Sequence, residues 1–89
     1  MISHLTETFR KAFAGLPAHV QAAARKNYKL WKKDPFHPSL EFKKAHTRRP
    51  IHSVRVGIGW RALGIVEGEH ITWFWIGSHN DYNNLLSRL

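Results

Sequence analysis

The C-terminal part of the chain places two side chains that can transfer protons directly after an apolar run. Residues 73–76 are Trp-Phe-Trp-Ile, and His79 and Tyr82 follow, three residues apart. If Ser78 caps a helix there, both side chains lie on one face of its first turn. Imidazole changes charge near neutral pH and a phenol can donate a proton, so the pair suits acid–base chemistry. Alternatively, Tyr82 heads an apolar stripe in the core and His79 is a surface residue.

Cationic side chains on the preceding strands could bind a phosphate beside that pair. Arg55 alternates with two valines, Arg61 begins the next apolar segment, and Lys43 and Lys44 lie on the segment before. Guanidinium groups bind phosphate through two parallel hydrogen bonds, so arginines on one sheet face suit a phosphate site. Each could instead be a solvated residue whose stem covers apolar surface.

Composition narrows the class of partner. The 89 residues include 14 Lys or Arg and 6 Asp or Glu, and the net charge is +8. This balance favours a polyanionic partner: nucleic acid, an acidic protein or an anionic membrane. The chain has no cysteine, and its seven histidines are scattered without ligand spacing, so we expect neither a metal nor a small-molecule cofactor. With no signal-peptide core and no apolar run of membrane-spanning length, we expect a soluble cytoplasmic protein.

Hydrophobic periodicity predicts one α+β domain over residues 1–89. Apolar residues at helical spacing predict two helices joined by a tight Leu-Pro turn, over residues 5–16 and 17–33. Alternating patterns then predict four short strands, 40–45, 51–56, 60–66 and 71–76, and a final helix from residue 78. Short links between strands imply an antiparallel meander. The expected fold is an N-terminal helical hairpin packed on a small antiparallel sheet of three to four strands, with a short C-terminal helix.

Two basic segments could contact phosphate groups without sequence preference. One is the polar face of the second helix, and the other is the loop that precedes residue 51. With Lys44, the candidate RNA-binding residues are Arg25, Lys26, Lys29, Lys32, Lys33, Arg48 and Arg49. The alternative is that these residues form only solvated faces.

Two runs of sequence carry a family resemblance, HSVRVGIGWRALG at 52–64 and WFWIGSHNDY at 73–82. With the Leu-Pro turn, the basic helix and PSLEFK at 38–43, they resemble the RelE/ParE superfamily of bacterial toxin–antitoxin toxins. The resemblance implies a helical hairpin against a small antiparallel sheet. It also implies one of two activities. The RelE-like branch cleaves messenger RNA without metal, generally in the ribosomal A site, whereas the ParE-like branch poisons DNA gyrase.

Within the RelE-like branch, the resemblance implies roles for five residues. Arg55 and Arg61 would hold the scissile phosphate while the ribose 2′-hydroxyl attacks it, leaving a cyclic phosphate and a free 5′-hydroxyl. Lys43 would add charge or help activate that hydroxyl, and His79 or Tyr82 would shuttle protons or stack on a base.

We therefore expect a metal-independent endoribonuclease toxin whose partners are mRNA, the ribosome and a cognate antitoxin. The alternatives are a ParE-like gyrase inhibitor and a non-catalytic homologue that binds nucleic acid and antitoxin. Two features depart from the family pattern. We expect the chain to enter its first helix without a preceding strand, and His79 stands where RelE-like members often carry arginine.

Overall fold

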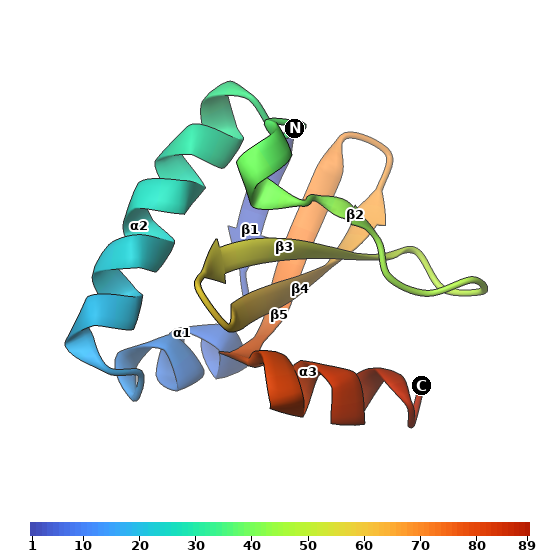
Figure 1. Cartoon of the computed structure of the whole chain (residues 1–89). Coiled ribbons are helices and arrows are strands. Elements are labelled where there is room, and N and C mark those ends of the chain that lie inside the picture. The colour runs from blue at the N-terminus through green and yellow to red at the C-terminus, as the bar shows by residue number, and fades with distance from the viewer.

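A mixed β-sheet forms the centre of the molecule, with a helical hairpin on one face and a short helix on the other (Figure 1). The computed structural model describes all 89 residues. The strands are β1 (Ile2–Leu5), β2 (Lys43–Lys44), β3 (Ile51–Gly57), β4 (Trp60–Glu67) and β5 (His70–Ser78). The helices are α1 (Glu7–Ala14), α2 (Ala18–Lys33) and α3 (His79–Leu86), and a 3-10 turn, η1, spans Pro38–Leu40. None of the helices combines the length and the apolar character that crossing a membrane requires.

The helical hairpin forms where the sequence predicts it. Thr6 caps α1, and its hydroxyl accepts a hydrogen bond from the backbone N–H of Phe9 at 3.1 Å. Pro17 occupies the N-cap of α2, where the absence of an N–H leaves no donor unsatisfied. The side chain of Gln21 donates to the carbonyl oxygens of Phe13 and Ala14 at 3.1 Å, which holds the start of α2 against the end of α1.

The sheet has the strand order β1-β5-β4-β3-β2. Strands β2 to β5 form the expected antiparallel meander. The expectation that the chain enters a helix directly is wrong, because residues 2–5 form a strand parallel to residues 70–73 of β5. The sheet is therefore five-stranded and mixed, not antiparallel with three to four strands. Four residues are too few for an alternation to stand out, and their partner lies near the other end of the chain.

The segment before β3 is less regular than its pattern suggests. Instead of a strand over residues 40–45, only Lys43 and Lys44 pair with β3. The 3-10 turn η1 precedes them, and Glu41 at its end has a φ of 47°, in the left-handed region. This turn redirects the chain and places Glu41 beside the arginines described below.

Two hydrophobic clusters lie on the two faces of the sheet. Beneath the hairpin, Trp31 of α2 packs edge-on against Phe42 and Trp73, with ring centroids 5.7 and 5.4 Å apart. On the other face, Tyr82 of α3 packs over the centre of the sheet in a cluster with Ile51 and Leu63. We call this second side the α3 face. Because side chains alternate along a strand, residues 51, 53 and 55 of β3 all point toward the α3 face.

Candidate functional site

The α3 face gathers the predicted arginines and the start of α3 next to the β3–β4 turn. Arg55 and Arg61 are directly opposite each other on β3 and β4, and Arg61 is opposite Gly77 on β5. The backbone N–H of His79 donates to the carbonyl of Gly59 in the turn at 2.7 Å. That bond fixes the first residue of α3 beside the arginine pair.

Arg61 is the buried member of the pair, with 4% of its surface exposed. Its Nη2 donates to the Oγ of Ser53 at 3.0 Å and to the carbonyl of Glu41 at 3.1 Å. Its guanidinium carbon lies 5.3 Å from the ring centroid of Tyr82, a cation–π distance. The Tyr82 hydroxyl donates to the same Ser53 oxygen at 3.2 Å. Arg61, Tyr82 and Ser53 therefore pack as one hydrogen-bonded unit below the surface.

Sequence reasoning missed two residues of this site. Ser53 is fully buried, and its only sequence signal is a polar residue at an inward position of β3. Glu41 has its carboxylate oxygens 3.8 Å from Nη1 of Arg55 and 3.7 Å from Nη1 of Arg61. No sequence pattern predicts that Glu41 belongs to this site, because its position depends on the left-handed conformation of its own backbone.

Arg55 is the accessible arginine, since 39% of its side-chain surface is exposed. Its distance to Glu41 is longer than a direct hydrogen bond, so its guanidinium N–H groups remain free to bind an anion from solvent. Lys43 is exposed and lies opposite Ser53 in the sheet, which places it on the α3 face as well. The structure thus offers two exposed cations and one carboxylate on the same surface.

His79 is exposed at the capped start of α3. Ser78 accepts a hydrogen bond from the backbone N–H of Asp81 at 3.1 Å, which confirms the predicted N-cap. The His79 ring stands edge-on to Tyr82 at 5.6 Å. Asn83 Nδ2 lies 3.2 Å from His79 Nδ1, one helical turn along α3.

Lys44 does not join this site. It pairs with His52, and alternation puts both side chains on the hairpin face of the sheet. The His52 ring lies against Phe42 with centroids 5.1 Å apart. Burial in this apolar setting, with the positive charge of Lys44 as a second cause, lowers the pKa of His52 below its ordinary value.

The other predicted RNA-binding residues lie on α2 or in the loop before β3, and a 3.2 Å contact between His46 Nε2 and the Leu89 carbonyl oxygen holds that loop near the C-terminus. Helix α2 lies across the sheet from α3 (Figure 1), and its cations are exposed. Two of them cover aromatic rings: Arg25 lies 5.1 Å from the centre of Phe13, and Lys32 lies 4.8 Å from that of Tyr28. The remaining members of the predicted set are Lys26, Lys29, Lys33, Arg48 and Arg49, all of which are exposed.

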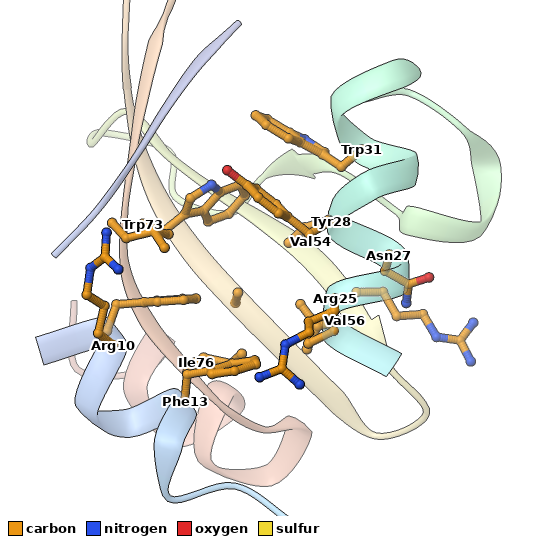
Figure 2. A pocket seen from close by; sticks show the side chains of 15 residues that line it. Arg10, Phe13, Arg25, Asn27, Tyr28, Trp31, Val54, Val56, Trp73 and Ile76 are labelled. Atoms are coloured by element: carbon orange, nitrogen blue, oxygen red, sulfur yellow. The ribbon is translucent and has the colours of Figure 1, made fainter. Parts of the chain in front are cut away.

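A separate apolar groove lies between the hairpin and the sheet. It encloses about 370 Å³ and is lined by 15 residues, of which 11 are hydrophobic. Figure 2 shows aromatic side chains from three elements converging on it, Phe13 of α1, Tyr28 and Trp31 of α2, and Trp73 of β5. Its polar lining residues include Arg10 of α1 and Arg25 of α2. We call this space the hairpin groove.

Solved structures with the same fold are toxins. The chain is similar to the RelB–RelE antitoxin–toxin complex of Methanococcus jannaschii, with a TM-score of 0.72, 17% identity, and coverage of 92% of this chain and 96% of that one. It is also similar to the toxin–antitoxin complex RelBE2 of Mycobacterium tuberculosis, with a TM-score of 0.68, 18% identity, and coverage of 86% and 95%. A copper-bound mutant toxin of Helicobacter pylori has a TM-score of 0.60, 17% identity, and coverage of 91% and 97%. No curated protein sequence matches the chain.

These likenesses confirm the α+β fold. Residues 18–84 match the sequence model of the ParE-like toxin domain. The chain belongs to this family and is a toxin of a toxin–antitoxin system.

Proposed function

We propose that this toxin is a metal-independent endoribonuclease that cleaves mRNA in association with the ribosome. The observation that carries the proposal is the pairing of Arg55 with Arg61 on the α3 face, with Glu41 and His79 beside them. A cation pair that neighbours a carboxylate and an imidazole supplies what 2′-hydroxyl attack on a phosphodiester needs.

The roles follow from exposure. Arg55 and Lys43 reach solvent and would bind the scissile phosphate and its developing charge. Glu41 would accept the proton of the 2′-hydroxyl as its oxygen bonds to phosphorus. His79 would donate a proton to the departing 5′-oxygen as the P–O5′ bond breaks. The products are a 2′,3′-cyclic phosphate and a 5′-hydroxyl, with no net change in protons.

Buried groups take a different part in this proposal. Arg61 and the Tyr82 hydroxyl are both engaged with Ser53, away from an incoming RNA strand. We assign them as positioning residues: Arg61 holds Glu41 through its main chain and carboxylate, and Tyr82 holds Arg61. The ring of Tyr82 also sets the edge-on orientation of His79.

The α2 cations have a supporting role in this proposal. They present positive charge on the side of the molecule away from the α3 face. Ribosomal RNA offers a surface of phosphates large enough to meet both sides at once, and such contacts need no base sequence.

A gyrase inhibitor is the second candidate, and the match to the ParE-like family favours it. Two assays on the purified toxin separate the candidates: mRNA cleavage with and without ribosomes, and supercoiling by DNA gyrase. An endoribonuclease gives RNA fragments with cyclic phosphate ends and leaves supercoiling unchanged. Arg55→Gln should abolish cleavage, whereas Arg88→Gln, at an exposed arginine beyond α3, should not. Inhibited supercoiling without RNA cleavage would establish the gyrase alternative, and neither effect would leave a non-catalytic homologue.

The partner of the toxin is a cognate antitoxin, and we propose that an acidic, apolar segment of it occupies the hairpin groove. The apolar lining requires a hydrophobic occupant, while the arginines of the groove and the net charge of +8 require a negative one. Co-expression with the adjacent gene product should give a complex that survives gel filtration. Phe13→Glu in the groove should break the complex, and Phe36→Glu, at a phenylalanine that is 74% exposed elsewhere, should not. Equal binding by both variants would place the antitoxin on another surface.

A further inference from the structure

Two exposed histidines meet at the β1–β5 edge of the sheet. Nε2 of His4 lies 2.9 Å from Nδ1 of His70, and their rings are nearly parallel, 16° apart with centroids at 5.2 Å. In the parallel ladder His70 is opposite Ile2, and His4 is opposite Thr72. The two histidines are thus diagonal neighbours on one face, close enough for long side chains to touch.

The separation of the two nitrogens matches that of two ligands on one metal ion. An imidazole nitrogen binds a divalent transition metal such as zinc at about 2.0–2.1 Å. Two such nitrogens at a right angle on one ion are then about 2.9 Å apart, and at the tetrahedral angle about 3.3 Å. The two nitrogens are therefore within reach of one ion, and Cu²⁺ and Ni²⁺, which favour tetragonal sites of nitrogen and oxygen ligands, suit two imidazoles completed by water.

We propose that His4 and His70 form a binding site for Cu²⁺ or Ni²⁺ on the edge of the sheet. In the metal-free pair, one ring N–H lies between the two nitrogens, and only one of them has a free lone pair. Binding moves that proton to the other nitrogen of its own ring and turns both rings so that their lone pairs converge. Both side chains are exposed, so this rotation disturbs no core packing.

Water would fill the remaining coordination positions of the ion. No group of three or more His, Cys, Asp or Glu side chains is placed to hold a metal, so the protein supplies two ligands and an open site. Glu67 is opposite His70 on β4, where its carboxylate adds negative charge on the same face. The ion would link β1 to β5 through side chains and add to the four-residue ladder that holds β1.

The test is the thermal stability of the untagged toxin in CuCl₂, NiCl₂, ZnCl₂ or MgCl₂, with EDTA to reverse binding. At a metal concentration about five times the dissociation constant, binding should raise Tm by about 4–8 °C in a domain of this size. Cu²⁺ and Ni²⁺ should raise Tm at lower concentrations than Zn²⁺, and Mg²⁺ should have no effect. His4→Ala and His70→Ala should each remove the shift, while His19→Ala, at an exposed histidine of α2, should keep it.

Two results would overturn the proposal. One is a wild-type Tm that no transition metal changes. The other is a shift that persists in His70→Ala, because the ion would then bind the N-terminal segment without β5. Neither result bears on RNA cleavage, so the test of this metal site is independent of the proposed function.

Discussion

Replacing Tyr82 by phenylalanine distinguishes a positioning tyrosine from a proton-transferring one. The ring keeps its place in the cluster with Ile51 and Leu63, and only the 3.2 Å hydrogen bond to Ser53 is lost. Ser53 keeps its bond from Arg61, so no buried acceptor is left without a donor. The loss is therefore that of one ordinary hydrogen bond, about 0.5–1.5 kcal/mol. In a domain of 60–100 residues, 1 kcal/mol lowers Tm by about 4–8 °C.

The assay pairs calorimetry with single-turnover RNA cleavage well below Tm. We expect Tyr82→Phe to lose stability by this amount while its cleavage rate falls less than tenfold. His79→Ala should show the opposite result, an unchanged Tm and a loss of about 10²–10⁴ in rate, as expected for an exposed general acid. Tyr28→Phe is the matched control, because it removes a 2.8 Å hydrogen bond to Ser3 away from the site and should lower Tm only. An unchanged Tm with a hundredfold slower reaction in Tyr82→Phe would refute the positioning role.

Three further predictions concern charge. Arg55→Ala should keep Tm within about 2 °C and abolish cleavage, because its side chain is accessible; a lower Tm without lost cleavage would contradict this. His52→Gln should reduce the loss of Tm as pH falls. The pKa of His52 is lowered in the folded state, so the unfolded state binds more protons and wild-type stability declines as the pH drops below about 6.5. The same pH dependence in wild type and variant would rule this out. Replacing Lys29, Lys32 and Lys33 by Gln should flatten the salt dependence of ribosome binding while the fold persists, and an unchanged slope would mark them as a solvated face.

The sequence contains enough local information to predict the arginine pair. Arg55 and Arg61 flank a glycine turn, so the sequence places them on neighbouring strands close to that turn. Their direct pairing also depends on a register shift between Arg55 and Gly57, which the sequence pattern does not predict. The start of α3 is also predictable, because a serine cap and the helical spacing that follows are local signals. Both predictions concern residues whose neighbours in space are near in sequence.

The parts that the sequence does not predict depend on distant or backbone-specific interactions. Glu41 reaches the arginines only because its own φ is positive, and residue identity alone does not specify that conformation. The burial of Arg61 depends on Ser53, Tyr82 and Glu41 together, which come from three elements. β1 is stabilised by a strand at the far end of the chain, so its four residues carry too little pattern by themselves.

The pairing of β1 with β5 determines when the chain can finish folding. Ser3 accepts a hydrogen bond from the indole of Trp73, 70 positions later, so the first strand has no partner until nearly the whole chain exists. Contacts of such long sequence separation form late and slow folding, because a long loop must close first. During synthesis the α1–α2 hairpin can form early, but β1 and the apolar surface next to it must wait for β5. His79 follows β5 directly, so the same final stretch of the chain closes the sheet and delivers the proposed general acid.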